Sequence, residues 1–309
     1  MTPATRPRYA PDWLALREPA DAAARAAALL APLRRHLARQ TGRRGPAGPQ
    51  ARRPAGRRAP ASTAPEAAPL LIRDLGSGTG SLGRWLAPRL PGPQHWILHD
   101  HDTALLDRAA ARKPAAAADG GPVTLTTEAG DLARLTAGDL HGTSLVTASA
   151  LLDLLTLEEV EHLAASCAGA RCPALLTLSV AGRVELTPEE PLDTVLTAAF
   201  NAHQRRADPE GRRLLGPDAV EAACTAFRRH GMTVRLHASP WRLGSGQAAL
   251  AAEWLKGWTG AAADQRPDLA QRADAALRRR LDACAAGALR VVVHHHDLLA
   301  LPRTAGDTP

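Results

Sequence analysis

The stretch LLIRDLGSGTGSLGRWLAPRL, residues 70–90, decides the fold of this 309-residue chain. Its apolar beginning, Leu70 to Leu75, is typical of a buried parallel strand, and its end has the apolar spacing of a helix. Between them lie three alternate glycines, Gly76, Gly78 and Gly80. Glycine suits these positions because the chain must turn sharply and bring bare backbone N–H groups against a ligand. The stretch therefore predicts a strand, a glycine loop and a helix that together bind a cofactor.

Two glycine patterns overlap in this loop. Residues 78–83 fit the dinucleotide pattern G-x-G-x-x-G, and residues 74–80 fit the pattern D-x-G-x-G-x-G. The dinucleotide pattern fits less well, because its first glycine normally follows the strand closely and here Gly76 and Ser77 intervene. The acid at the strand end, Asp74, also suits a cationic amino acid better than a pyrophosphate. The loop thus favours a cofactor that carries an amino-acid group.

Two further segments extend the pattern. The apolar run 94–100 ends in Asp100, about twenty residues beyond the glycines, where a carboxylate can accept hydrogen bonds from ribose hydroxyls. After another predicted helix and strand comes the triplet Gly130-Asp131-Leu132, and the next strand ends near Ser149. From residue 70 to about residue 180, this order of segments resembles the class I methyltransferases that use S-adenosylmethionine (SAM).

The resemblance implies a role for each matching residue. Gly76, Gly78 and Gly80 would approach the methionine part of SAM, Asp100 its ribose, and Asp131 the amino group of its adenine. His101 and Leu132 would lie against the adenine faces, and Asp74, Ser77 and Ser149 complete the predicted cofactor-binding set. The implied fold is a Rossmann-like α/β sheet of seven strands that ends in an antiparallel pair. The alternative is a glycine turn without a ligand, with Asp131 as a plain turn residue.

Two other segments bear on the chemical identity of the methyl acceptor. Residues 149–153 read SALLD, whereas members of the resembled family that methylate nucleobase amines usually carry D/N-P-P-Y/F/W there, so such an amine is not expected as acceptor. Insertions after the fifth strand lie above the methyl-transfer site in that family. The segment after residue 187 therefore supplies our candidate general base, His203, which shares a helix side with Phe200 and Gln204. The alternative is a histidine that only packs the helix.

The sequence divides into three parts. Residues 1–40 contain one predicted helix from Pro19 to Gln40, and one interpretation of it is a lid, because N-terminal helices often cover the cofactor site in similar methyltransferases. Residues 41–69 contain six arginines and no apolar periodicity, so they are predicted to be a disordered linker. Residues 70–303 form the predicted methyltransferase domain, with helical insertions at about 187–215 and 246–287. The second insertion would interrupt the terminal hairpin.

Composition narrows the classes of function. The net charge of +7 arises largely in residues 41–69, so the remainder is close to neutral. Four cysteines without metal spacing indicate a reduced, cytoplasmic environment, and no stretch approaches the ~18 apolar residues of a membrane span. The run His294-His295-His296 is not expected to hold a metal, because alternation along a strand places at most two of these side chains on one face.

These observations predict an enzyme, a SAM-dependent methyltransferase that transfers a methyl group to an oxygen or nitrogen of a small molecule. One alternative is an RNA methyltransferase that uses the arginine-rich linker to bind phosphates. Another is a non-catalytic, SAM-binding member of the fold. A nicotinamide-dependent oxidoreductase is the least favoured hypothesis.

Overall fold

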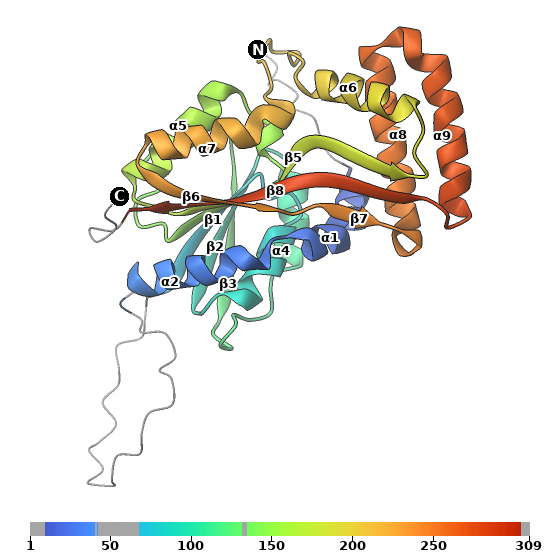
Figure 1. Ribbon diagram of the computed structural model, residues 1–309. Coiled ribbons are helices and arrows are strands. Elements are labelled where there is room, and N and C mark those ends of the chain that lie inside the picture. The colour runs from blue at the N-terminus through green and yellow to red at the C-terminus, as the bar shows by residue number, and fades with distance from the viewer. Residues whose placement is uncertain (1–9, 41, 43–67, 132–134, 304–309) are drawn as a thin grey trace, which may run out of the picture.

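A computed structural model describes residues 10–40, 42, 68–131 and 135–303. One mixed sheet forms their centre, in the strand order β3-β2-β1-β4-β5-β8-β6, and the short β7 also pairs with β8 (Figure 1). β1 to β5 run parallel, whereas β8 is antiparallel to β5, β6 and β7. The strands are β1 (Leu70–Leu75), β2 (Gln94–Asp100), β3 (Val123–Ala129), β4 (Leu145–Ser149), β5 (Ala174–Thr187), β6 (Met232–Ala238), β7 (Trp241–Leu243) and β8 (Arg290–Pro302).

The strand order confirms the predicted fold class. The chain proceeds from β1 to β2 and β3 on one side, and then crosses to β4 and β5 on the other side. The topological switch point therefore lies between β1 and β4, where α/β sheets of this kind bind their ligands beyond the carboxyl ends of the strands. Buried apolar residues such as Ile72, Leu98 and Val146 fill these central strands, as expected for a parallel sheet covered on both faces.

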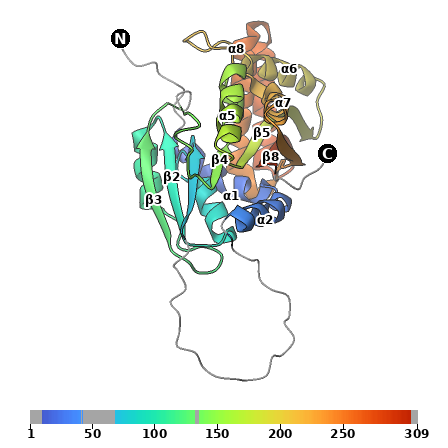
Figure 2. The same cartoon turned by 90° about the vertical axis from the view of Figure 1, so that its left-hand side faces the viewer.

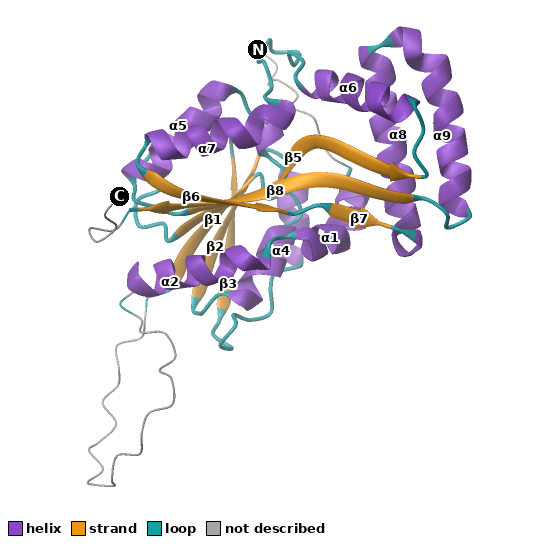
Figure 3. Cartoon of the chain, viewed as in Figure 1, coloured by secondary structure: helices purple, strands orange, loops and turns teal. Residues whose placement is uncertain are grey.

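Helices cover both faces of the sheet (Figure 3). Leu33 of α2, Leu86 of α3 and Ala109 of α4 belong to one buried apolar cluster on the first face. Val160 of α5 and Phe227 of α7 belong to a second cluster on the opposite face. The helices are α2 (Leu30–Gln40), α3 (Ser81–Leu86), α4 (Thr103–Ala111), α5 (Leu157–Gly169) and α7 (Ala219–Arg229).

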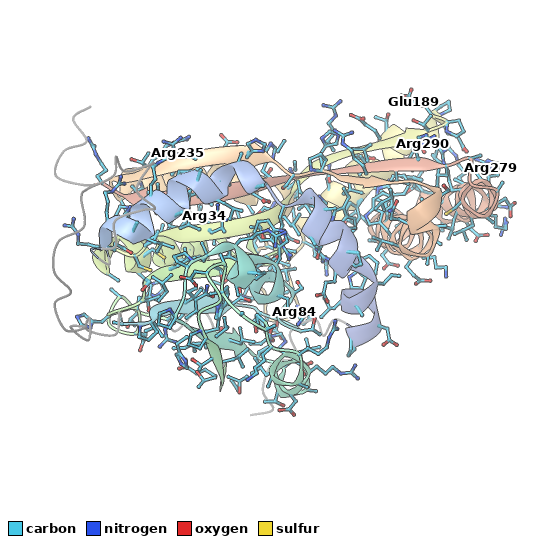
Figure 4. The ribbon with its side chains drawn as sticks, turned by 90° about the horizontal axis from the view of Figure 1, so that it is seen from below. Arg34, Arg84, Glu189, Arg235, Arg279 and Arg290 are labelled. Carbon is cyan, nitrogen blue, oxygen red and sulfur yellow. The ribbon has the colours of Figure 1, made fainter. Side chains whose placement is uncertain are left out.

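An arm, residues 181–204 and 241–293, extends the sheet at one end. It combines the far halves of β5 and β8 with β7 and the helices α6 (Leu192–Gln204), α8 (Ala248–Gln265) and α9 (Ala270–Ala285). These elements share their own apolar cluster, which includes Leu196 and Trp258. Figure 2 shows that β2 and β3 lie on the side of the molecule away from α6 and α8. In Figure 4, Glu189, Arg279 and Arg290 gather at the tip of the arm.

The terminal antiparallel pair is intact, contrary to the expectation that the helical insertion interrupts it. β6 pairs with the second half of β8, from Met232 opposite Pro302 to Ala238 opposite His296. β7 pairs with the first half of the same strand. Because β8 is 13 residues long, one strand serves both partners, and the insertion 246–287 only extends the hairpin beyond the sheet.

The N-terminal segment forms two helices instead of the single predicted one. α1 (Pro11–Ala24) begins earlier than expected and contains Pro19 in its interior. The backbone then becomes extended at Arg25 and Ala26, and α2 follows after a short 3-10 turn. The break has a distant cause, because the Ala26 N–H donates a hydrogen bond of 2.7 Å to Oδ2 of Asp297 on β8.

Local hydrogen bonds set other boundaries. Asp102 is the N-cap of α4, since its carboxylate accepts hydrogen bonds from the backbone of Ala104 and Leu105. Thr156 and Glu159 form a capping box at the start of α5. β5 and β8 reach 14 and 13 residues because they pair with each other far beyond the core of the sheet.

Part of the predicted organisation falls outside the described residues. Residues 41 and 43–67 of the predicted linker, and the predicted adenine contact Leu132, are not described. Among the helices that are described, none combines the length and the apolar character that crossing a membrane requires.

Replacing Asp297 by alanine tests the link between β8 and the N-terminal segment. Asp297 is buried, and its Oδ1 accepts hydrogen bonds from the Leu178 N–H at 2.8 Å and the Ser239 hydroxyl at 2.6 Å. Each buried donor left unpaired costs about 1–3 kcal/mol. We expect Asp297→Ala to lower the free energy of unfolding by about 3 kcal/mol or more in urea denaturation. The exposed Asp107→Ala on α4 is the control, with an expected change within about 0.5 kcal/mol. Equal losses in the two variants would contradict the assignment.

Candidate functional site

A cavity lies at the carboxyl ends of β1, β2 and β4, at the topological switch point. Its walls come from the glycine loop after β1, the loops after β2, β3 and β4, helix α1, and the segment 206–214 after α6. Several predicted cofactor residues line it together, namely Asp74, Gly76, Ser77, Gly78, Asp100, His101 and Ser149. Residues far apart in the sequence therefore meet at one site.

The glycine loop has the conformation that its sequence predicts. Gly76 and Gly78 have φ angles of +59° and +53°, a region that side chains with a Cβ rarely adopt. A Cβ on Gly78 would also lie 3.4 Å from Leu14 Cδ1 of α1. The Ser77 N–H donates to the His99 carbonyl at 3.1 Å, which fixes the loop to the end of β2.

Asp100 holds the tip of the loop and remains available to a ligand. Its Oδ2 accepts a hydrogen bond of 2.8 Å from the Gly78 N–H, and its Oδ1 accepts one of 3.0 Å from the Asp102 N–H. Nδ1 of His101 lies 3.3 Å from the same Oδ1. A carboxylate oxygen can accept two hydrogen bonds, so Oδ2 can still accept one from a ligand in the cavity.

Asp74 is a buried acid with an incomplete set of partners. Its Oδ1 accepts a hydrogen bond of 2.8 Å from the Thr147 hydroxyl, whereas its Oδ2 and the Ser77 hydroxyl have no hydrogen-bond partner among the described residues. Burial raises the pKa of Asp74 to about 7, although the hydrogen bond from Thr147 and the charge of Arg25 act in the opposite direction. Buried polar atoms are normally satisfied, so these two indicate a polar ligand at the loop.

Arg25 is a functional candidate that the sequence did not indicate. Its side chain follows the break after α1, and the residue is only 4% exposed. Nη2 donates to the hydroxyls of Ser81 and Ser149, both at 3.2 Å, and both serines line the cavity. Nε has no partner, and no carboxylate of the described residues forms an ion pair with Arg25. Burial lowers its pKa, with Asp21 opposing the shift.

Helix α1 forms one wall of the cavity and is tied to the glycine loop. Glu18 receives two hydrogen bonds of 2.7 Å from Arg84 of α3, and Arg84 also donates to the Thr79 carbonyl in the loop. Figure 4 shows Arg84 well away from the tip of the arm. The position of α1 relative to the glycines is therefore fixed by a bidentate ion pair, the stronger kind of such contacts.

Three of the predicted site residues do not line the cavity. Gly80 packs against α4, since a Cβ on it would lie 3.2 Å from the Cβ of Ala109. Asp131 is exposed next to Gly130, which does line the cavity. His203 lies near the end of α6, where burial lowers its pKa and Asp264 of α8 opposes the shift. The insertion reaches the cavity through residues 206–214 instead, so the role of His203 as a base stays a prediction without a contact to the site.

Asp153 is a half-buried acid whose neighbours Leu151 and Leu154 line this cavity. It belongs to the 3-10 turn Leu152–Leu154 that follows β4. Its Oδ1 is buried without a partner among the described residues, and burial raises its pKa while the charge of Arg17 opposes the shift. The SALLD segment marked this place in the sequence, but nothing in it distinguished Asp153 from a surface residue.

Comparisons with known proteins give similarity at the level of the fold. No protein-family model matches this sequence, and no curated protein matches it. Similar solved structures include the YcgJ protein from Bacillus subtilis, with 15% identity over 77% of this chain and 94% of that chain and a TM-score of 0.42. A SAM-dependent methyltransferase from Geobacter sulfurreducens, in complex with S-adenosylhomocysteine, has 16% identity over 76% and 85% of the two chains and a TM-score of 0.38. A cyclopropane synthase from Mycobacterium tuberculosis has 11% identity over 75% and 78% and a TM-score of 0.39.

The raised pKa of Asp74 predicts a pH-dependent stability in the absence of ligand. Between the unfolded value of 3.8 and the folded value of about 7, the folded protein binds a proton that the unfolded chain has released. Stability therefore falls as pH rises through this window, by an amount of the order of 4 kcal/mol for this residue. We expect urea denaturation at pH 5 to 8 to give a smaller decline for Asp74→Asn than for the wild type. The exposed Asp107→Asn should follow the wild type, and parallel curves for all three proteins would contradict the assignment.

Proposed function

We propose that this chain is a SAM-dependent methyltransferase that acts on a small molecule. The observation that carries the proposal is the pair of buried, opposite and incompletely partnered charges at the glycine loop, Asp74 and Arg25. A zwitterionic amino acid offers an ammonium group for the acid, and a carboxylate for the hydroxyls of Ser81 and Ser149 that Arg25 supports. Such a ligand compensates two buried charges at once, and the two residues form no ion pair with each other.

The other cofactor residues support the same ligand. Asp100 has an acceptor position left for a ribose hydroxyl beside the loop. We propose His101 and Asp131, with Leu132, for the adenine on the strength of the motif that they match. A dinucleotide is a poorer match, because its pyrophosphate would bring two negative charges towards Asp74 and Asp100. The site thus favours a cofactor with an amino-acid end and a nucleoside end.

The chain's own residues supply alignment and exclusion of water. When bound, SAM supplies a methyl group attached to a positively charged sulfur, and this sulfur is the leaving group, which is released as a neutral thioether. Leu151, Leu154 and Leu155 follow β4 and line the cavity with aliphatic groups. These side chains keep water from the place where an acceptor would meet the methyl group, and α1 forms another wall of the cavity. Positioning and dehydration are the main contributions a protein makes to such a displacement.

Thermal denaturation with candidate ligands tests the cofactor. A ligand at 100 times its dissociation constant stabilises a folded protein by about 2.7 kcal/mol. We expect S-adenosylhomocysteine to raise the melting temperature and NAD to leave it unchanged. Asp100→Ala should lose the shift, whereas Asp107→Ala should keep it. Because Asp100 also anchors the loop, the variant's affinity is measured by calorimetry at a temperature where circular dichroism shows it folded.

The opposite ligand pattern, a shift with NAD alone, would remove the proposal. Transfer itself is tested by incubating the protein with a cell extract and methyl-labelled SAM, where we expect one labelled small molecule. Cofactor binding without any labelled product would identify a non-catalytic SAM-binding protein.

The proposed role of Arg25 predicts that its replacement weakens ligand binding but changes the free energy of unfolding little. Arg25→Met removes a buried charge that has no carboxylate partner, so the free energy of unfolding should change by no more than about 2 kcal/mol in either direction. The affinity for S-adenosylhomocysteine should fall by about tenfold or more, since hydrogen bonds to charged groups contribute about 1.5–3 kcal/mol. Urea denaturation and calorimetry measure the two quantities, and Arg235→Met, on an exposed position of β6, is the control. Unchanged affinity in Arg25→Met would rule out its role.

A further inference from the structure

The part of the cavity beyond the cofactor residues has an aliphatic wall. Leu14 of α1, Leu151 and Leu154 after β4, and Pro209 and Leu214 after α6 line it. No phenylalanine, tyrosine or tryptophan is among the described residues that line the cavity. The only aromatic ring among the described lining residues is the imidazole of His101, which the proposed function assigns to the cofactor, whereas a flexible aliphatic chain matches the leucine and proline side chains.

Arg17 presents a positive group to this part of the cavity. Its side chain is 14% exposed, and its Nε donates a hydrogen bond of 2.9 Å to Asp21 Oδ2. The guanidinium lies over Trp241, 5.1 Å from the ring centroid. Nη1 and Nη2 have no hydrogen-bond partner among the described residues. The guanidinium is thus held through Nε by Asp21 and through one face by Trp241. Its two terminal nitrogens, Nη1 and Nη2, form a fork of N–H donors that the described residues leave free.

The acids nearby do not occupy this fork. Both oxygens of Asp21 are already engaged, since Oδ1 accepts a hydrogen bond of 3.0 Å from Trp241 Nε1 and Oδ2 accepts one from Nε of Arg17, and neither accepts one from Nη1 or Nη2 of Arg17. Asp153 forms no ion pair with Arg17, and burial raises its pKa. Asp208 pairs with Arg212 at 2.7 Å, and Arg212 also pairs with Glu159. The fork of Arg17 therefore has room for an acid from outside the chain.

A second arginine at the same cavity adds positive charge. Arg206 lines the cavity from the segment after α6, and the only described hydrogen bond of its side chain goes to the carbonyl of His203 at 2.9 Å. No described carboxylate pairs with it. Two arginines without a complete set of acidic partners thus line the cavity together with these aliphatic side chains.

We propose, building on the proposed function, that the methyl acceptor has an aliphatic body and an acidic group, and that Arg17 binds this group through its free fork. A guanidinium with two parallel N–H donors matches the two oxygens of a carboxylate or phosphate, and such bidentate pairs are about twice as strong as neutral hydrogen bonds. Arg206 strengthens the attraction at the cavity. Arg17 is then a specificity-determining residue, because it selects the acceptor by charge.

Simple amphiphiles test the inference on the whole chain. Protein saturated with S-adenosylhomocysteine is titrated by calorimetry with octanoate, octyl phosphate, octanol and octylamine, which share one aliphatic body and differ in the head group. We expect one or both anions to bind at least about tenfold more tightly than octanol or octylamine. If octanoate binds more tightly than octyl phosphate, the acidic group is assigned as a carboxylate. If octyl phosphate binds more tightly, it is assigned as a phosphate.

Variants of Arg17 identify the residue responsible. Arg17→Gln should reduce the affinity for the anion by about tenfold or more and leave S-adenosylhomocysteine binding unchanged. Arg17→Lys keeps the charge but loses the fork, so it should recover only part of the affinity. Arg235→Gln is the matched control, since Arg235 lies on β6 away from Arg84 and the cavity (Figure 4). Circular dichroism at the temperature of the titration verifies that each variant is folded.

Three results would overturn the inference: equal affinities for the four head groups, no binding of either anion, or an anion affinity that Arg17→Gln leaves unchanged. Each of these is distinct from failure of the proposed function, in which S-adenosylhomocysteine itself does not bind. Without that ligand, the same titrations are made on the free protein and still report on the charge preference of the cavity.

Discussion

One buried carboxylate, Asp297, determines how the N-terminal segment meets the sheet. It lies on β8, accepts hydrogen bonds from the backbone of Ala26 and Leu178, and accepts a third from the Ser239 hydroxyl. Because Ala26 is fixed there, the chain cannot remain helical between α1 and α2, and Arg25 is placed beside Ser81 and Ser149. The same contact orients α1, which brings Leu14 and Arg17 to the cavity. Much of the site therefore depends on a contact that is not itself part of it.

The site contains charged groups that the folded protein does not fully compensate. Asp74, Asp153 and Arg25 each have a buried polar atom without a partner among the described residues. Uncompensated buried charge lowers stability, and the pKa of Asp74 is raised to about 7 for this reason. Tightly packed apolar clusters on both faces of the sheet and in the arm offset that cost. The arrangement suits a ligand that completes the missing contacts, because the groups are already oriented when it arrives.

The sequence predicted the parallel half of the sheet because its signals are local. A strand, a glycine loop and a helix follow one another within twenty-one residues, and Asp100 ends the next strand at the expected spacing. Asp74, Gly78 and Asp100 were found in this way, and they do line one cavity. Arg25 and the break after α1 could not be found, since the hydrogen bond that causes the break joins Ala26 to a residue 271 positions away. The extent of β5 and β8 also depends on distant residues, because each strand is prolonged by pairing with the other.

This difference separates the side of the cavity that we propose for the cofactor from the side that we propose for the acceptor. The cofactor side is built from loops at the carboxyl ends of β1 and β2, whose geometry requires particular residues such as Gly78 and Asp100. The acceptor side is built from α1 and the segment 206–214, neither of which belongs to the parallel core. A helix face and an inserted loop accept many sequences, so a pattern common to the fold carries no information about them. What the proposed acceptor side recognises follows from which positive groups keep free donors once the chain has folded. There the terminal nitrogens of Arg17, which the described residues leave free, and the side chain of Arg206 support the proposed acidic group.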